Sequence, residues 1–178
     1  MRAFRSLLIP VLFGLALLAV AVVVRFGLLQ REDPGQPINS AMREAMGRAV
    51  MPPADLEQVM QRFPGAIETG TGLRYVVERP GHGESPRRGQ YVAVHYRESL
   101  LDGTVINDTH ARGEGPFNFL IGQRQVMAGW EEALADMKPG EKRILIIPYW
   151  LGYGEKGAKG LVPARATLVV ELELLQIR

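Results

Sequence analysis

The segment from Thr167 to Ile177 alternates apolar and polar residues with a regular period of two. One face of it carries Leu168, Val170, Leu172 and Leu174. Glu171 and Glu173 fall on the opposite side of the same predicted strand. A strand with one apolar and one charged face needs a sheet whose one side covers a core. This segment therefore predicts a sheet in the C-terminal part of the chain.

From Gly72 onward the sequence reads mainly as strands separated by turns. The predicted strands are Leu73–Glu78, Tyr91–Leu101, Thr104–Ile106, Glu141–Ile147 and Thr167–Ile177. Asp102-Gly103 is a strong hairpin signal between the second and third of them. Because only one short helix interrupts these strands, we predict an α+β fold in which an antiparallel half-barrel sheet curls around one short α-helix.

The predicted helix carries a tryptophan on its apolar side. Val126, Trp130, Leu134 and Met137 recur at helical spacing. A lone tryptophan in such a place often plugs a core. In the strand Tyr91–Leu101, however, Tyr96 shares a face with the apolar Val92 and Val94 and should point toward the helix. The residues thus allow either a core plug or an apolar pocket lined by Trp130 and Tyr96.

Composition excludes several classes of function. The 178 residues have a net charge of +2 and no basic run interleaved with aromatics, so nucleic-acid binding has no support. The chain has no cysteine, which excludes disulfides and thiolate chemistry. His82, His95 and His110 lack metal-ligand spacing, so we expect no metal site. Glu131 and Glu132 are helix neighbours that point apart, and we expect them to form a solvated face.

The N-terminal segment 1–29 has the pattern of a membrane anchor. Arg2 and Arg5 precede an uncharged run from Ser6 to Val24, which as a helix would span about 27 Å. We predict a single-pass anchor with the rest of the chain outside the cytoplasm. The alternative is a signal peptide cleaved after Ala19-Val20-Ala21, which would release an exported soluble protein.

Residues 30–39 read as a linker because Pro34, Gly35 and Pro37 stand among polar residues. Residues 40–71 form a predicted helical arm: Ser40 caps one helix, and Pro52-Pro53 opens a second. The apolar stripe of the second helix would be Leu56, Val59, Met60 and Phe63. The methionine-bearing arm could bind a partner chain, but we favour packing of its stripes on each other or on the main domain.

Residues 72–178 resemble the FKBP-type peptidyl-prolyl cis-trans isomerases, or immunophilins. The matching motifs are Val94-His95-Tyr96, Asp102-Gly103-Thr104-Val105, Pro116-Phe117-Asn118-Phe119, Gly122-Gln123, Val126–Glu132, Met137–Glu141, Ile147-Pro148, Leu151-Gly152-Tyr153-Gly154, Pro163 and Ala166–Val169. Each motif alone is weak, whereas the ordered set is highly specific.

The resemblance implies a proline-binding pocket. The implied catalytic residues are Tyr96, Phe117, Trp130 and Tyr153, with Trp130 as the floor. The implied substrate-binding residues are Ile106, Asn107, Val126, Met127, Val162 and Val170. By the same resemblance, the backbone N–H at Met127 and the hydroxyl of Tyr153 donate hydrogen bonds to ligand carbonyls.

Three positions depart from the family pattern. Ile106 and Val170 stand where phenylalanine is usual, and Asn107 stands where the family has an aspartate. These changes make the implied pocket less aromatic and remove the carboxylate expected there. Asp108 is adjacent, but a shift of one residue along a strand turns a side chain to the other face. We expect proline binding to tolerate these changes better than catalysis does.

The resemblance implies an isomerase that acts on X-Pro bonds of exported proteins during folding and needs no cofactor. Its partners would be proline-containing unfolded or nascent polypeptides, the membrane through the N-terminal helix, and macrolide-type inhibitors. The alternative is a weakly active or non-catalytic module that binds proline-containing or unfolded peptides.

Overall fold

The computed structural model describes residues 51–113 and 115–178. The predicted membrane anchor 1–29, the linker 30–39 and the helix capped by Ser40 lie outside the described residues. Within the part of the chain that is described, no helix is both long and apolar enough to cross a bilayer.

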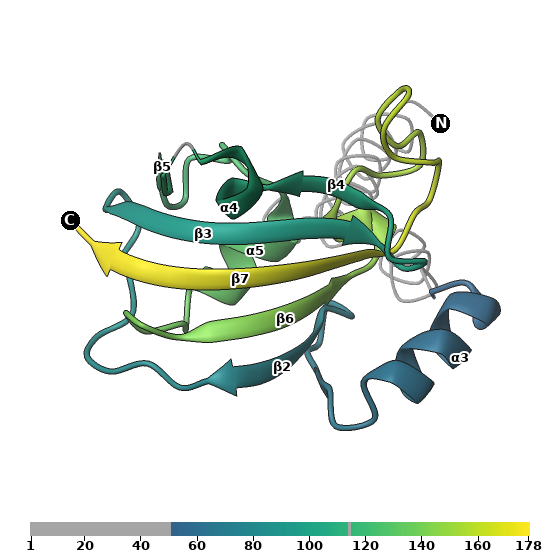
Figure 1. Ribbon diagram of the computed structural model, residues 1–178. Helices are drawn as coiled ribbons and strands as arrows, with labels where there is room; N and C mark the ends of the chain where they lie inside the picture. Colours follow the sequence, from purple (N-terminus) through teal and green to yellow (C-terminus); the bar gives the residue numbers. More distant parts are fainter. Residues whose placement is uncertain (1–50, 114) are drawn as a thin grey trace, which may run out of the picture. The chain divides into compact units, whose positions relative to one another are not determined.

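A curved antiparallel sheet forms the body of the molecule (Figure 1). Its strands are β1 (Ile67–Glu68), β2 (Arg74–Arg79), β3 (Tyr91–Leu100), β4 (Val105–Asp108), β5 (Phe117–Leu120), β6 (Lys142–Ile147) and β7 (Leu168–Ile177). They are ordered β1-β2-β6-β7-β3-β4, and β5 also pairs with β3. The helices are α3 (Pro53–Arg62), α4 (Thr109–Arg112) and α5 (Ala128–Leu134), with a short 3-10 helix at Tyr149–Leu151. The antiparallel sheet with a helix across it is the predicted fold.

The inner face of the sheet holds the main core. Four apolar side chains of β7 are fully buried there: Leu168, Val170, Leu172 and Leu174. Helix α5 lies across this face, behind the sheet in the view of Figure 1. Gly129 permits the close approach, because a Cβ at this position would lie 2.8 Å from Cγ2 of Ile147. The helix is shorter than predicted, so Val126 precedes it and Met137 follows it.

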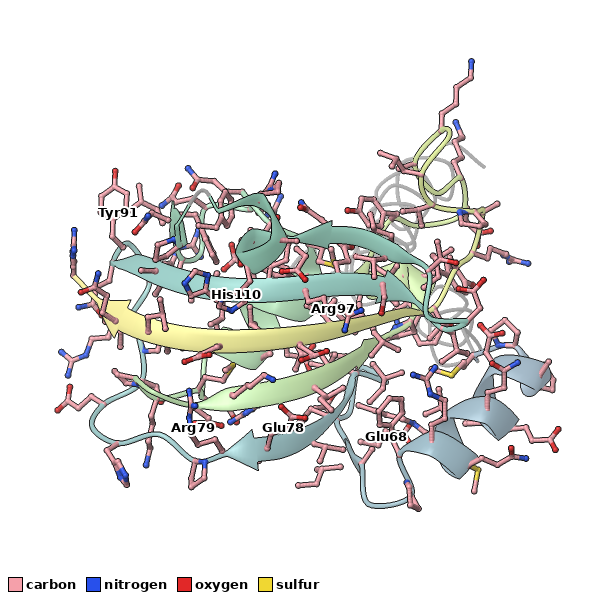
Figure 2. All side chains as sticks on the ribbon, in the orientation of Figure 1. Glu68, Glu78, Arg79, Tyr91, Arg97 and His110 are labelled. Atoms are coloured by element: carbon pink, nitrogen blue, oxygen red, sulfur yellow. The ribbon has the colours of Figure 1, made fainter. Side chains whose placement is uncertain are left out.

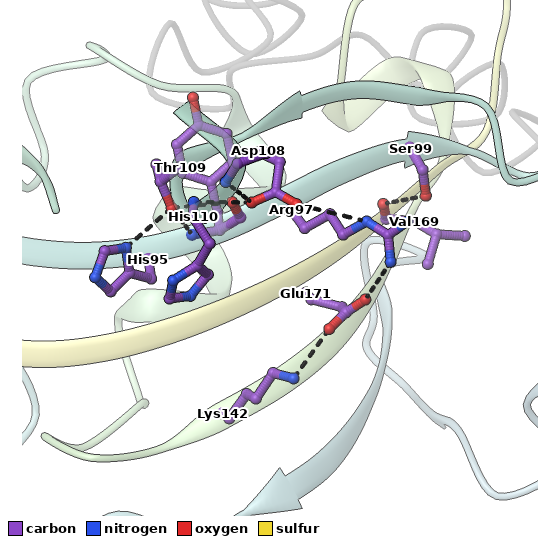
Figure 3. Close-up of polar contacts among 11 residues, drawn as sticks. His95, Arg97, Ser99, Asp108, Thr109, His110, Lys142, Val169 and Glu171 are labelled. Atoms are coloured by element: carbon purple, nitrogen blue, oxygen red, sulfur yellow. Dashed lines mark hydrogen bonds and ion pairs between the residues drawn. The ribbon is translucent and has the colours of Figure 1, made fainter. Parts of the chain in front are cut away.

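The outer face carries charged side chains in pairs, as the alternation in β7 predicts. Arg79, Glu78, Arg97 and His110 stand on this side in Figure 2. Lys142 Nζ lies 2.9 Å from a carboxylate oxygen of Glu78. It lies 2.9 Å from Glu171 as well, and Arg97 reaches Glu171 at 3.6 Å (Figure 3). Such half-exposed pairs contribute little to stability individually. They keep this face of the sheet solvated.

Helix α3 packs on a second apolar cluster of the same sheet. The cluster contains Met51, Val59, Leu101, Ile146 and Val169, with Leu56 and Phe63 against it. Asp55 accepts a hydrogen bond from the hydroxyl of Thr167 at 2.7 Å, and Arg62 donates to the carbonyl of Leu101. The prediction that Met60 belongs to the packed stripe is wrong, since its side chain is 60% exposed. This part of the arm therefore packs on the main domain.

Candidate functional site

A cleft of about 300 Å³ opens beside the N-terminal end of α5. The residues that line it come from β3, β4, β5, the loop before α5, α5 itself and the loop after β6. They are Tyr96, Glu98, Asn107, Phe117, Arg124, Gln125, Val126, Met127, Trp130 and Tyr153. We refer to these ten residues as the cleft.

The floor and one wall of the cleft are aromatic. Trp130 lies at the bottom with 3% of its surface exposed. The ring of Tyr96 meets it edge-on with the centroids 4.7 Å apart, and Phe117 meets Tyr96 edge-on at 6.1 Å. These separations are typical of favourable aromatic pairs. Because the indole borders an open cleft, Trp130 is more than a core plug.

Polar contacts hold Tyr96 in the wall of the cleft. Asn107 donates from Nδ2 to the Tyr96 hydroxyl at 2.6 Å. Thr109 fixes the backbone behind it, accepting from Tyr96 N–H at 3.0 Å and donating to Tyr96 C=O at 3.2 Å. Burial raises the pKa of Tyr96, and the Arg112 guanidinium opposes part of the rise. The phenol therefore stays neutral.

Asp108 does not replace the missing cleft carboxylate. Its side chain caps α4 instead, accepting from the N–H groups of His110 at 2.8 Å and Ala111 at 3.2 Å. It also lies 3.8 Å from Arg97 on the outer face of the sheet (Figure 3). The expectation that a one-residue shift turns Asp108 away from the cleft is confirmed.

The loop before α5 is held by Glu131. Its carboxylate accepts from Gly122 N–H at 2.6 Å and from Arg124 N–H at 3.1 Å. The expectation that Glu131 only forms a solvated face is wrong, because the loop amides need an acceptor at this point. This contact places Met127 at the helix start, where no acceptor among the described residues takes its N–H. That N–H is available to a ligand.

Tyr153 also lines the cleft and is 39% exposed. Its hydroxyl donates to Oε2 of Glu98 at 3.4 Å. Burial, reinforced by the charge and hydrogen bond of Glu98, raises the pKa of Tyr153 to about 12. The hydroxyl therefore keeps its proton throughout the physiological range.

Glu98 is a cleft residue that the sequence interpretation missed. It is 3% exposed, and its cross-strand partners are Val170 on β7 and Asn107 on β4. Burial raises the pKa of its carboxyl, against an opposing hydrogen bond from Tyr153. The alternation that turns Val94 and Tyr96 inward also turns residue 98 inward, so the signal was present. The expectation that the cleft has no carboxyl group is wrong.

The structure brings together most of the predicted site residues. Tyr96, Asn107, Phe117, Val126, Met127, Trp130 and Tyr153 all line the cleft. It does not place Ile106, Val162 and Val170 among the lining side chains. Val170 is fully buried, Val162 is 5% exposed, and Ile106 packs against the same core cluster. These three residues support the cleft from behind.

A smaller hollow of about 110 Å³ lies on the outer face and includes His95 and His110. Their rings stack with centroids 4.1 Å apart, and His95 Nδ1 lies 3.0 Å from the Thr109 hydroxyl. Over the described ranges, no cluster of histidine and carboxylate side chains is arranged to hold a metal ion.

Comparison with known proteins explains the cleft. Residues 82–175 match the family model described as FKBP-type peptidyl-prolyl cis-trans isomerase. The chain belongs to this family. The resemblance inferred from the ordered motifs is thus confirmed, and the chain is an enzyme of the peptidyl-prolyl cis-trans isomerase class.

Relatives of this FKBP-type isomerase occur in distant organisms. FK506-binding protein 1A of Neurospora crassa is 44% identical over 108 residues, which cover 60% of this chain and 89% of that protein. The FKBP-type 22 kDa peptidyl-prolyl cis-trans isomerase of Escherichia coli is 45% identical over 113 residues, covering 64% of this chain and 53% of the relative. The crystal structure of AtFKBP13 superposes with a TM-score of 0.59 at 31% identity, covering 64% of this chain and 98% of that one.

Proposed function

We propose that the cleft binds the proline ring of an X-Pro peptide against Trp130 and catalyses rotation about the X-Pro bond. The observation that carries this proposal is the open aromatic cleft floored by Trp130, in a chain of the isomerase family. Tyr96 and Phe117 complete an apolar wall that fits a proline ring.

Rotation about the X-Pro bond makes and breaks no covalent bond, and the cleft can speed it by removing water from the prolyl amide. An X-Pro bond isomerises in tens to hundreds of seconds, because the twisted amide loses its resonance. The planar amide is more polar than the twisted one, so an apolar cleft that excludes water lowers the barrier between them. A thousandfold acceleration needs only about 4 kcal/mol.

Two donors in the cleft would hold the peptide while the proline turns. The N–H of Met127 lies at the start of α5, and Tyr153 lines the same cleft. If each donor binds a carbonyl that flanks the rotating bond, the chain is fixed and the barrier falls without an entropic loss at the transition state. Tyr153 and Met127 would then orient the substrate, and Trp130 would supply the surface.

The cellular setting follows from residues 1–29. The uncharged run from Ser6 to Val24 supports a membrane-tethered isomerase that acts on exported polypeptides as they fold outside the cytoplasm. Protease treatment of intact and opened cells tests this placement. The anchor proposal expects digestion only after the outer barrier is opened, with activity in the membrane fraction. Activity in the soluble periplasmic or secreted fraction would favour a cleaved signal peptide.

The cleft also offers a surface for a macrolide inhibitor. Three relatives are named FK506-binding proteins, and one of them is 42% identical over 107 residues. We therefore propose that FK506 competes with prolyl peptides for the cleft of this chain.

The rate of cis-to-trans conversion of an X-Pro peptide tests the proposed activity. Trp130→Leu removes the aromatic floor, and we expect a loss of at least about tenfold in kcat/KM. Trp150→Leu is the matched control, because Trp150 lies outside the cleft and packs on the α3 cluster. Binding of the peptide without any acceleration would contradict the catalytic proposal and favour a peptide-binding module, an alternative made relevant by Ile106, Asn107 and Val170.

A further inference from the structure

Glu98 is the one acidic residue among the ten that line the cleft. Its side chain lies on the inner face of β3, between Asn107 and Val170 on the neighbouring strands. One carboxyl oxygen, Oε1, is buried and has no hydrogen-bond partner among the described residues. The other, Oε2, contacts only the Tyr153 hydroxyl at 3.4 Å in that part of the chain. The paired carboxylates of the outer face have no such isolation.

The contact decides where the Tyr153 proton points. A phenol has one hydrogen to donate, and an ionised carboxylate can only accept. While Glu98 is ionised, Tyr153 donates to it and has no hydrogen left for a substrate carbonyl. A protonated Glu98 can itself donate to the phenol oxygen, which frees the Tyr153 hydrogen to point into the cleft.

We propose that Glu98 is a positioning residue that controls the Tyr153 donor, so that protonation of Glu98 makes Tyr153 available to the carbonyl of a bound prolyl peptide. The proposal rests on the function proposed for the cleft. It predicts tighter peptide binding and faster isomerisation as the pH falls.

The surrounding groups support this assignment. Burial raises the pKa of Glu98, which brings its protonation closer to neutral pH, whereas Tyr153 with a pKa of about 12 keeps its hydrogen. The other ionisable groups near the carboxyl are Tyr96 on β3, Arg112 on α4, which acts on Tyr96, and Arg124 in the loop before α5. On β4 and β7 its direct neighbours, Asn107 and Val170, carry no charge.

The stacked histidines of the outer face call for a control. His95 contacts Thr109, which hydrogen-bonds the backbone of Tyr96 and so connects the outer face to the cleft. His110→Gln serves as the matched control, because His110 is exposed and lies outside the cleft.

The experiment measures kcat/KM and the dissociation constant for one uncharged X-Pro peptide between about pH 5 and about pH 8. For the wild-type chain and His110→Gln, we expect kcat/KM to rise about threefold to tenfold as the pH falls, the value of one neutral hydrogen bond. Glu98→Gln and Tyr153→Phe should both give flat profiles. The double variant should behave like Tyr153→Phe alone, because Glu98 acts through Tyr153.

Two outcomes would overturn the inference while leaving the isomerase proposal intact: a pH profile that is unchanged in Glu98→Gln, or one that flattens only in His110→Gln. A chain that binds the peptide but accelerates nothing would refute the proposed function instead. The Glu98 inference would then be judged on the dissociation constant of the peptide. This constant must still increase with rising pH in the wild-type chain and stay the same at every pH in Glu98→Gln.

Discussion

Two phenols line the cleft, Tyr96 and Tyr153, but their hydrogen-bond partners differ. Tyr96 is 8% exposed, packs on Trp130 and accepts a short hydrogen bond from the amide of Asn107. Tyr153 is 39% exposed and donates a long hydrogen bond to the carboxyl of Glu98. An amide cannot titrate, whereas a carboxyl can. Tyr96 is therefore a fixed part of the core, whereas Tyr153 can change its hydrogen bonding with pH.

The largest expected effect is a difference in stability between variants of the two phenols. Tyr96→Ala leaves a cavity against Trp130, so we expect the free energy of unfolding to fall by about 3–5 kcal/mol. Tyr153→Ala should cost about 1 kcal/mol or less, because its side chain is partly solvated. Urea denaturation followed by tryptophan fluorescence measures both. Equal losses of unfolding free energy would show that Tyr153 is as much a part of the core as Tyr96.

The next effect is on activity. Tyr153→Phe removes a donor but keeps the ring, so kcat/KM should fall by about threefold to tenfold in the acidic part of the range. Little change is expected at higher pH, where Glu98 already occupies the hydroxyl. The peptide isomerisation assay at two pH values checks this. A loss of equal size at both values would mean that Glu98 does not compete for the Tyr153 hydrogen.

Glu98→Gln should change stability with a definite sign. The folded-state pKa of Glu98 is raised, so its stabilising contribution is present in acid and is lost as the pH rises through that value. A glutamine does not ionise, and the variant should be more stable than the wild-type chain by about 1 kcal/mol at neutral pH. Below the usual glutamate pKa the two should converge. A variant that is less stable at neutral pH would contradict this reasoning.

The smallest effect should come from Asn107→Asp. A carboxylate there would accept the Tyr96 hydrogen instead of donating to its oxygen, which orients the phenol. We expect kcat/KM to rise about twofold to threefold at neutral pH. It should also gain a new dependence on pH, because the introduced carboxyl group can be protonated. Asn107→Ser keeps a neutral side chain and is the control. If activity falls in Asn107→Asp, the amide is the better partner for Tyr96.

The sequence predicted the fold because its longer strands alternate cleanly. The paired faces of β3 and β7 and the Asp102-Gly103 turn follow from period and turn chemistry alone. β5 and α4 have four residues each, which is too short for a period to be visible. The extent of α5 was overestimated, because Val126 and Met137 keep helical spacing without being helical.

The site was predicted less completely, because its chemistry depends on tertiary contacts. The aromatic floor follows from Trp130 and from the inward face that includes Tyr96. The same alternation reaches Glu98, but a buried charge without a partner contradicts the usual distribution of side chains. Val170 was predicted to be a wall of the cleft, whereas it is fully buried and pairs across the sheet with Glu98.

Exchange NMR of an X-Pro peptide with the labelled protein tests most directly whether the prolyl bond turns in this cleft. The peptide reports its cis-trans exchange rate, and the protein reports in the same sample which backbone amides the peptide perturbs. We expect accelerated exchange at substoichiometric protein, with the largest shifts at Met127 and at the Trp130 indole. Accelerated exchange with perturbations elsewhere, or perturbed cleft amides without acceleration, would contradict the account.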